Sequence, residues 1–311
     1  MLLNEKNVLT KRLSEVMDLK NIFTDEALSK HTSFRIGGPA AFYAIVENPS
    51  ELKDVIRVCR EEKADHYLLG NGTNVLAPDE GYDGVVIRLG GTFNEISISE
   101  NINDGSALVT AGAGVSMAQL AMYALKKGFT GLEFAHGIPG SVGGGIYMNA
   151  GAYGGEIGNC LVSVRALTPD GDIVELKKDE LELDYRTSRF TKGDEIILDG
   201  TFYLKVYPRI PIRTMMEEYK KKRNEKQPLD LPSAGSTFKR PEGGFAGKLI
   251  EEAGLKGFRI GGAAVSEKHA GFIVNVGEAS AKDVLELIET VKKRVFENSG
   301  IMLEPEIKII R

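Results

Sequence analysis

The chain has 311 residues, of which 42% are hydrophobic and 27% charged, so it can fold around a large core without disulfide or metal staples. Its 36 glycines and 11 prolines follow no short period, which excludes collagen, a coiled coil or disorder as the main architecture. The net charge of -5 argues against a protein whose main task is to grip nucleic acid.

The cysteine content and the hydropathy pattern indicate a compartment. Cys59 and Cys160 form no CxxC pair, which is typical of a reducing environment. Residues 1–20 contain no long apolar run, and no stretch reaches the ~18 apolar residues of a membrane span. We therefore expect a cytoplasmic protein that binds neither nucleic acid nor a membrane. We also expect a monomer, although the sequence itself does not determine the oligomeric state.

The N-terminal part of the sequence predicts a small α/β unit. Residues 1–30 are polar and helical in pattern. A second helix opens at Pro49, with apolar residues at helical spacing from Leu52 to Cys59. Strand, helix and strand then follow in close succession. The predicted strands cover residues 41–46, 67–69 and 85–89.

A second α/β region follows. Its helix is predicted over 116–127, with Gly128 as a C-cap. Pro169-Asp170-Gly171 predicts a hairpin turn. The strands of this region are predicted over 96–98, 107–110, 162–167, 173–176 and 196–206.

The proline-rich segment 208–211 predicts a boundary before the C-terminal part. Ser280 and Asp283 form a capping-box start for a long helix. The basic run 220–223 lies among glutamates, which predicts a solvated helix face rather than a nucleic-acid site. The other elements are predicted as a charged helix over 212–226, an amphipathic stretch over 245–253, and strands over 271–276 and 301–310.

The most informative segment covers residues 137–156 and contains eight glycines. Backbone without side chains can approach a ligand closely and can direct several N–H groups at one anion. No Lys or Arg occurs between residues 131 and 158, so backbone dipoles would hold a pyrophosphate here, with or without a helix N-terminus. A tight glycine loop at a domain junction is the alternative.

Two shorter glycine turns, 70–74 and 111–115, each follow a predicted strand. Each alone is typical of an ordinary strand-to-helix turn, but three glycine segments together indicate one extended ligand. GxxxxGK[ST], GxGxxG, HExxH and GxSxG are all missing. Their absence argues against a P-loop kinase, a Rossmann dehydrogenase, a zincin and an α/β-hydrolase.

Five segments occur in the order of a known family: 70–74, 137–156, Tyr185–Phe190, Ala234–Lys239 and Leu303–Ile307. Together they resemble the UDP-N-acetylenolpyruvoylglucosamine reductases, flavoenzymes that complete UDP-N-acetylmuramate in peptidoglycan synthesis. The resemblance extends from about Thr32 to Lys308 and is specific in combination, although each motif alone is not.

The resemblance implies an α+β architecture: an FAD-binding fold of the vanillyl-alcohol-oxidase (PCMH) type in two subdomains, followed by a smaller α+β substrate-binding domain. The implied FAD-binding subdomains cover residues 1–90 and 91–208. The substrate-binding domain would cover 209–300, and residues 301–311 would form a C-terminal strand that carries a catalytic glutamate.

FAD is the implied cofactor and NADPH the implied co-substrate. In the family, NADPH reduces FAD, and the reduced flavin passes hydride to the enolpyruvyl double bond of the UDP-sugar substrate. The residues implied to bind FAD are Arg35, Gly70, Asn71, Gly72, Thr73, Asn74, Gly112, Gly114, Gly137, Pro139, Gly140, Ser141, Gly143, Gly144, Asn149 and Gly151.

Hydride addition places negative charge on the α-carbon and carboxylate, so the site needs a cation or donor and an acid. By resemblance, Arg186 makes a bidentate hydrogen bond to the carboxylate and Ser236 donates the proton. Glu306 then hydrogen-bonds the enediolate if it is protonated, or orients Arg186 if it is ionised. From the residues alone, the alternatives are a surface cation for Arg186, a turn hydroxyl that caps the backbone for Ser236 and a solvated strand-edge charge for Glu306.

Four residues are implied to bind substrate: Tyr153, Lys239, Arg240 and His269. Lys239 is also a candidate to polarise Ser236, and the Lys239-Arg240 pair can neutralise the UDP diphosphate. The alternatives are a core aromatic for Tyr153, a solvated basic pair for Lys239 and Arg240, and a structural role for His269. The other histidines show no metal-ligand spacing, so we expect no metal.

One subgroup of the family carries an extra loop, with a tyrosine that covers the substrate, between the matched arginine and serine. Arg186 and Ser236 are 50 positions apart here, which leaves no room for that loop and places the resemblance with the shorter subgroup. Two other functions stay open: a flavin-dependent oxidase of a small alcohol, and a nucleotide-sugar binding module without redox chemistry.

Overall fold

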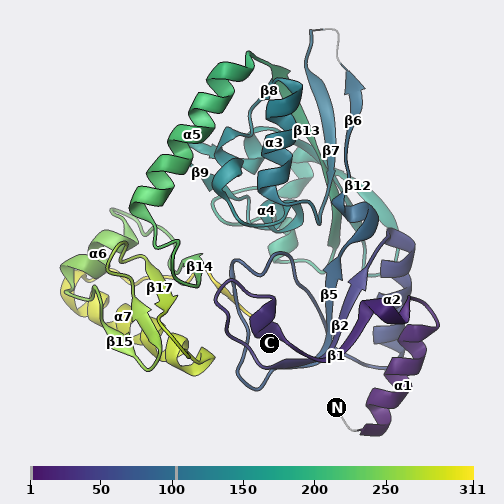
Figure 1. The fold of residues 1–311 in the computed structure, drawn as a ribbon, viewed down its shortest axis with the longest axis horizontal. Coiled ribbons are helices and arrows are strands. Elements are labelled where there is room, and N and C mark those ends of the chain that lie inside the picture. Colours follow the sequence, from purple (N-terminus) through teal and green to yellow (C-terminus); the bar gives the residue numbers. More distant parts are fainter. Residues whose placement is uncertain (1–2, 102–103) are drawn as a thin grey trace. The chain divides into compact units, whose positions relative to one another are not determined.

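The computed structural model describes residues 3–101 and 104–311 (Figure 1). The chain divides into two compact units. The first contains the residues up to 23, 43–71 and 85–223, and the second contains 24–42, 72–84 and 224–311. The chain passes between the units within three strands of a sheet whose order is β1-β2-β5-β3. These strands are β1 (Ile22–Ala27), β2 (Pro39–Val46), β5 (Tyr82–Leu89) and, within the first unit, β3 (His66–Leu68).

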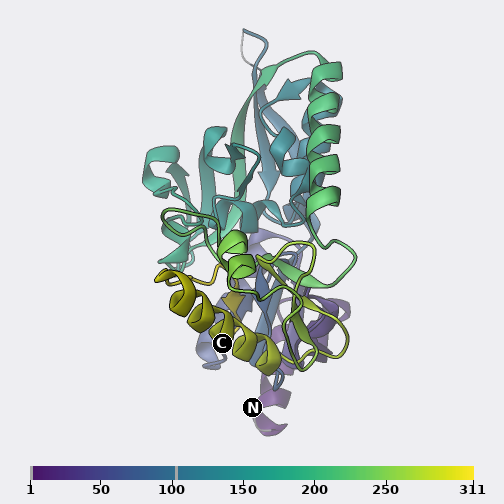
Figure 2. The ribbon, with the colours of Figure 1, turned by 90° about the vertical axis from the view of Figure 1, so that its left-hand side faces the viewer.

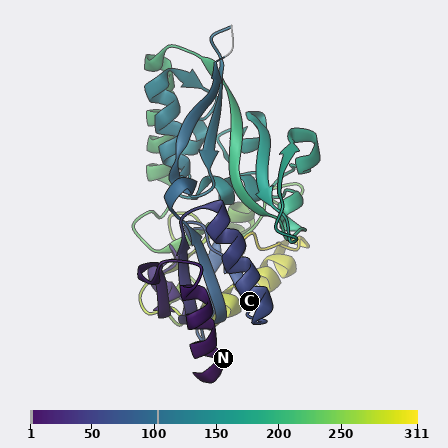
Figure 3. The same cartoon turned by 90° about the vertical axis from the view of Figure 1, so that its right-hand side faces the viewer.

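Two helices of the first unit, α1 (Leu3–Ser14) and α2 (Pro49–Glu61), lie side by side (Figure 3). The Asn48 side chain caps α2 by accepting the Glu51 N–H at 3.0 Å. The prediction of helix throughout 1–30 is wrong after Ser14. Asp18 accepts the Lys20 N–H at 3.1 Å and starts a short 3-10 turn, after which the chain pairs as β1; residues 1 and 2 lie outside the described part.

The main sheet of the first unit has six strands in the order β12-β11-β13-β7-β6, with β8 also paired to β13. The predicted hairpin is confirmed: β11 pairs antiparallel with β12, and Gly171 has a φ of +87° in their turn. The strands are β6 (Ile96–Asn101), β7 (Ala107–Gly112), β8 (Phe129–Thr130), β11 (Leu161–Leu167), β12 (Ile173–Lys177) and β13 (Ile196–Val206).

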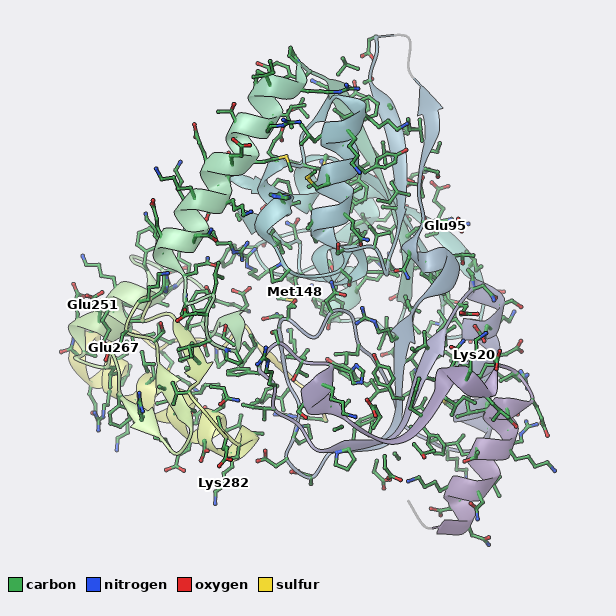
Figure 4. The ribbon with its side chains drawn as sticks, viewed as in Figure 1. Lys20, Glu95, Met148, Glu251, Glu267 and Lys282 are labelled. Carbon is green, nitrogen blue, oxygen red and sulfur yellow. The ribbon has the colours of Figure 1, made fainter. Side chains whose placement is uncertain are left out.

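One helix of the first unit precedes the glycine loop in sequence, and another lies within it. The predicted helix over 116–127 is confirmed as α3 (Met117–Lys127), which starts at a capping box between Ser116 and Gln119 and ends at left-handed Gly128. The short α4 (Val142–Tyr147) packs against β13 and leads to buried Met148, which Figure 4 labels.

The first unit ends at Arg223, within helix α5 (Arg209–Lys226), which is continuous in Figures 1 and 2. The helix begins three residues before the predicted start. Pro211 lies in its first turn, where a missing N–H costs no helical hydrogen bond. Ile212 and Met216 are buried and so define the face that packs on the unit.

The second unit has a sheet in the order β14-β17-β16-β15, against which α7 (Ala281–Ser299) packs (Figure 2). The capping box predicted between Ser280 and Asp283 is confirmed. Exposed charged residues of this unit include Glu251, Glu267 and Lys282 (Figure 4). The other elements are β14 (Ser233–Ser236), α6 (Ala246–Glu252), β15 (Arg259–Ile260), β16 (Ala263–Val265) and β17 (Phe272–Asn275).

The C-terminal segment forms less strand than predicted. Only β18 (Lys308–Ile309) is a strand, and it pairs parallel with β4 (Val75–Leu76) in the second unit. Residues 304–306 instead bond to 237–239 on both sides of an isolated bridge between Phe238 and Pro305. The ladder cannot continue regularly because Pro305 has no N–H to donate.

Within the two described stretches of the chain, no helix is both long enough and apolar enough to cross a bilayer.

Candidate active site

The predicted site residues are divided between the two units. Arg186 and the glycine loop belong to the first unit, whereas Ser236 and Glu306 belong to the second. The first unit also holds Gly70, Asn71, Gly112, Gly114 and Tyr153. The second also holds Arg35, Gly72, Thr73, Asn74, Lys239, Arg240 and His269.

In the first unit, the first glycine turn is tied to the long glycine loop. The Asn71 Nδ2 donates to the Pro139 carbonyl at 3.2 Å. Arg88 on β5 donates from Nη1 to the Gly70 carbonyl at 2.7 Å and from Nη2 to Asn71 Oδ1 at 3.1 Å. Arg88 therefore orients the amide that joins the two segments, a role that its place in an apolar strand did not reveal.

The amides at the start of α4 are already used by the protein. The N–H groups of Val142 and Gly143 donate to the carbonyls of Val115 and Ala113 at 2.7 and 2.9 Å, and the Gly144 N–H donates to Ser141 Oγ at 3.2 Å. These three donors cannot at the same time bond a pyrophosphate. The loop instead offers partly exposed main chain, with Gly144 itself exposed, and the hydroxyl hydrogen of Ser141.

The second glycine turn has a structural reason for its glycines. A Cβ at Gly112 would lie 2.2 Å from the Phe93 carbonyl oxygen, and one at Gly114 would lie 2.8 Å from the Leu89 carbonyl oxygen. The protein's own backbone therefore leaves no room for side chains, which supports the structural alternative for this turn. A contact of these two residues with FAD stays a prediction.

Arg223 brings a cation to the glycine loop from α5. It is half-buried, and one of its Nη atoms donates to the Gly137 carbonyl. Burial lowers the pKa of the guanidinium. The predicted solvated face is thus confirmed for exposed Lys220, Lys221 and Lys222 but wrong for Arg223. Its spacing of seven from Met216 was the available signal, since that spacing puts both on the buried face.

Arg186 is held in a constrained conformation rather than left on the surface. Its φ is +56°, in a turn closed by the bridge between Asp184 and Thr187. Its Nη2 donates to the Gly151 carbonyl at 3.1 Å, and the guanidinium lies 5.2 Å from the Tyr185 ring centroid. The glycine loop and the predicted catalytic arginine are therefore in direct contact.

Asn149 holds the Arg186 turn in place. Its Nδ2 donates to the Asp184 carbonyl at 3.2 Å, and its Oδ1 accepts the Gly158 N–H at 2.9 Å. Asn149 is buried with a φ of +39°. Left-handed residues other than glycine cost about 1–3 kcal/mol each and cluster at functional sites. Asn149, Tyr153 and Arg186 form such a cluster within the first unit.

In the second unit, Ser236 lies on a bulged strand rather than in a free turn. Between the pairs Ser233–Val274 and Ser236–Phe272 the register shifts, and Gly235 has a φ of +77°. A bulge of this kind redirects a side chain. Ser236 is exposed at the end of β14.

Glu306 lies next to the Ser236 strand. Its N–H donates to the Thr237 carbonyl at 2.8 Å, and its carbonyl accepts from Asn74 Nδ2 at 3.4 Å. Glu306 is half-buried, so it is not the fully solvated edge charge of the alternative interpretation. The second unit therefore brings Asn74, Ser236 and Glu306 together from three distant segments.

The Arg35 loop belongs to the same unit. Ser33 Oγ donates to the Ser233 carbonyl at 2.6 Å, which ties the loop to β14. Arg35 is exposed and left-handed, with a φ of +56°, between buried Phe34 and Ile36.

The predicted substrate residues of the second unit have partners within the protein. Lys239 Nζ forms an ion pair with Glu304, and the Arg240 guanidinium lies 4.7 Å from the Phe245 ring centroid. His269 Nδ1 accepts the Gly271 N–H at 3.1 Å. Burial lowers the pKa of His269, which favours a neutral imidazole at pH 7. Tyr153, in the first unit, is 39% exposed.

Comparison with known proteins shows which family has this sequence. Residues 227–310 match the model of the UDP-N-acetylenolpyruvoylglucosamine reductase C-terminal domain, and residues 40–177 match that of an FAD binding domain. The UDP-N-acetylenolpyruvoylglucosamine reductase of Lachnoclostridium phytofermentans is 46% identical over 98% of this chain and 97% of its own. The enzyme of the same name from Clostridium novyi is 44% identical over 97% of this chain and 96% of its own.

The chain belongs to the UDP-N-acetylenolpyruvoylglucosamine reductase family.

Solved structures confirm the predicted fold. The UDP-N-acetylenolpyruvylglucosamine reductase of Thermus caldophilus superposes with a TM-score of 0.78 at 37% identity, covering 92% of this chain and 98% of its own. p-Cresol methylhydroxylase superposes with a TM-score of 0.50 at 12% identity, covering 98% of this chain and 67% of its own. At this identity the match shows the shared fold alone. The predicted family, the PCMH-type α+β fold and the FAD-binding character are therefore confirmed.

The residues of this reductase family member fit FAD. Gly70 and Ser141 lie so close that a Cβ on Gly70 would be 2.7 Å from Ser141 Oγ, so the turn and the loop form one surface with little side chain. Gly70, Asn71, Gly137 and Gly140 on this surface are partly exposed. Asn71, Ser141 and the nearby main chain would hold the dinucleotide, with Arg88 and Arg223 fixing the carbonyls behind them.

Proposed function

We propose that the chain catalyses NADPH-dependent reduction of the enolpyruvyl group of UDP-N-acetylglucosamine-enolpyruvate to UDP-N-acetylmuramate, a step of peptidoglycan biosynthesis. When bound, FAD supplies hydride transfer, accepting hydride from NADPH and delivering it to the enolpyruvyl double bond. The chain's own residues bind the carboxylate, orient it and supply the proton that completes the lactyl ether.

One observation carries this proposal. The hydrogen bond from the Glu306 N–H to the Thr237 carbonyl places Glu306 and Ser236 on neighbouring main-chain segments, although the two lie 70 positions apart in sequence. Reduction of an enol ether conjugated to a carboxylate needs a proton donor for the α-carbon. Beside it, the reaction needs a group that stabilises the negative charge on the substrate carboxylate. We propose that Arg186, which belongs to the first unit, is the third catalytic residue of this reaction.

Each residue then has a defined task. Arg186 donates two parallel N–H bonds to the substrate carboxylate, where charge grows as hydride arrives at the β-carbon. Ser236 gives its proton to the α-carbon. Glu306 hydrogen-bonds the enediolate or orients Arg186, according to its ionisation. Lys239 is held against Glu304, so any contact with the UDP diphosphate requires it to exchange partners.

The subgroup assignment, the cytoplasmic location and the monomeric state are parts of the same proposal. The stretch between Arg186 and Ser236 consists mainly of β13 and α5, which supports the absence of the family's tyrosine loop.

Absorbance spectroscopy tests the function. The purified protein should carry a flavin spectrum that NADPH bleaches in the absence of air. Adding the enolpyruvyl UDP-sugar should restore the oxidised spectrum in a single rapid phase, with air restoring it much more slowly. Rapid oxidation by air with no response to the sugar would instead identify an oxidase, and a protein without flavin would indicate a binding module.

A further inference from the structure

The strained Tyr153 lies at the tip of a very short hairpin in the first unit. Strands β9 (Gly151–Ala152) and β10 (Gly155–Glu156) pair with Ala152 opposite Gly155, which leaves a two-residue turn. Tyr153 and Gly154 have φ values of +54° and +85°. Positive φ at both central positions is the signature of a type I′ turn, whose first position favours Asn, Asp or Gly. A tyrosine there is a poor choice for the backbone alone.

A second tyrosine compensates for this choice. The rings of Tyr153 and Tyr219 are stacked, with centroids 4.7 Å apart and planes inclined by 9°. Tyr219 comes from α5, on the face that also carries buried Met216 and the Arg223 contact to the Gly137 carbonyl. The helix is therefore attached to the glycine loop at two places, and Tyr153 is fixed from outside its own hairpin.

The same hairpin contacts the predicted catalytic arginine. Arg186 Nη2 donates to the carbonyl of Gly151, which pairs with Glu156 at the base of the hairpin. The turn residues Tyr153 and Gly154 are thus two and three positions from the Gly151 carbonyl, which orients the guanidinium. A displacement of the tip is transmitted to this carbonyl because the hairpin is too short to absorb it.

We infer that Tyr219 is a positioning residue for the reaction: by stacking on Tyr153 it fixes the β9–β10 hairpin, and with it the geometry in which Tyr153 and Arg186 meet the UDP-sugar. The inference rests on the proposed function, because it concerns how that substrate binds. It also gives α5 a role at the site in a chain without the family's tyrosine loop.

The test compares Tyr219→Phe, Tyr219→Leu and Tyr219→Ala in the FAD-loaded enzyme. Calorimetric titration of the oxidised holoenzyme with the enolpyruvyl UDP-sugar should give a Kd about three- to tenfold weaker for Leu and Ala, the range expected for loss of an aromatic pair. Phe keeps the stacked ring and should bind within twofold of wild type. The KM for the sugar should rise with the Kd, while kcat at saturating sugar changes less than twofold.

Met215→Ala is the matched control, since Met215 lies on α5 and is 39% exposed. It should alter neither Kd nor KM. In Tyr153→Ala, the further change of Tyr219 to Ala should have no additional effect, because the stack is already lost. Leu retains apolar bulk on the helix, so the set stays informative if the Ala variant unfolds.

The outcomes separate the two proposals. A wild-type enzyme that neither binds the sugar nor is reoxidised by it defeats the proposed function. A wild-type enzyme that does both, with Tyr219→Leu binding the sugar as tightly as wild type, overturns the role of Tyr219 alone. Equal losses in the Phe and Leu variants would also overturn it, since a stacked ring would then not be what matters.

Discussion

The glycine-loop region of the first unit and the β14–β17 region of the second position their proposed functional residues in opposite ways. In the first, Asn149, Tyr153 and Arg186 all have positive φ, and each is restrained by contacts to other segments. In the second, Ser236 and Glu306 lie on adjacent main-chain segments joined by main-chain hydrogen bonds, and Gly235 lies in the register shift between the Ser233 and Ser236 pairs. The first region stores strain to hold a guanidinium, whereas the second presents a hydroxyl at little conformational cost.

This contrast predicts that the second region separates chemistry from stability. Ser236→Ala should reduce reoxidation of the flavin by the enolpyruvyl UDP-sugar by about 1,000-fold, within the usual range for loss of a general acid. Because Ser236 is exposed, the Ser236→Ala variant should unfold at the same temperature as wild type. Its flavin should still be reduced by NADPH at the wild-type rate. Stopped-flow absorbance measures both half-reactions. Ser233→Ala on the same strand is the control, and equal loss of both half-reactions in Ser236→Ala would refute the assignment.

The first region can be probed without releasing its strain. Arg186→Lys keeps a long side chain and a positive charge at the left-handed position but loses the two-pronged geometry. We expect kcat/KM for the sugar to fall about 10- to 100-fold, as for loss of a hydrogen bond to a charged group. Arg189→Lys, in the adjacent turn and paired with Glu195, is the control and should act only on stability. Activity equal to wild type would show that Arg186 contributes charge and no directed bonds.

Arg88 tests whether restraint in the first region extends to the cofactor. Arg88→Met should release both the Gly70 carbonyl and the Asn71 amide and so weaken FAD binding to the apoprotein about tenfold. Titration followed by flavin fluorescence measures this affinity. Asn71→Ala should cost less affinity in the Arg88→Met background than in wild type, because the link to Pro139 is already weakened there and only the direct Asn71 contact to FAD remains to be lost. Arg57→Met, on the exposed face of α2, should leave FAD affinity unchanged, and full additivity would contradict the shared link.

The two regions also differ in how far sequence predicts them. Local signals sufficed where a helix defines its own ends: Gly128 ends α3, and Ser280 with Asp283 starts α7. Local signals failed where pairing with distant segments determines the secondary structure. Residues 22–27 are polar enough for a helix but join a sheet, and Pro305 breaks the strand predicted over 301–310.

The candidate site shows the same limit. Motifs located the glycine loop, Arg186, Ser236 and Glu306, because those segments carry recognisable residue patterns. Arg88, Tyr219 and Arg223 lay in stretches that read as an ordinary strand and a charged helix. Their importance comes from tertiary contacts: Arg88 bonds to Gly70 and Asn71, Tyr219 stacks on Tyr153, and Arg223 bonds to Gly137. The spacing of Arg223 predicts its burial on α5, but the sequence contains no signal for the partners of these three residues.

The smallest expected effect concerns the regular hydrogen bonding of the second unit and its dependence on pH. Asp283 accepts the N–H groups of Ser280 and Gly262 at 3.0 and 3.2 Å, and these bonds, the Ser280 one foremost, hold the pKa of its carboxyl below the ordinary value. Since the unfolded chain titrates near pH 4, the stabilisation is present above about pH 4 and is lost as pH falls through the lower folded pKa. An acid at a helix N-terminus contributes about 0.3–1 kcal/mol to the free energy of unfolding.

Asp283→Asn retains an oxygen acceptor but cannot titrate, so the free energy of unfolding of this variant should fall less steeply than that of wild type as the pH drops below 4. Chemical denaturation at several pH values measures the two slopes, and identical slopes would show that the capping carboxylate does not contribute to the acid sensitivity of this unit.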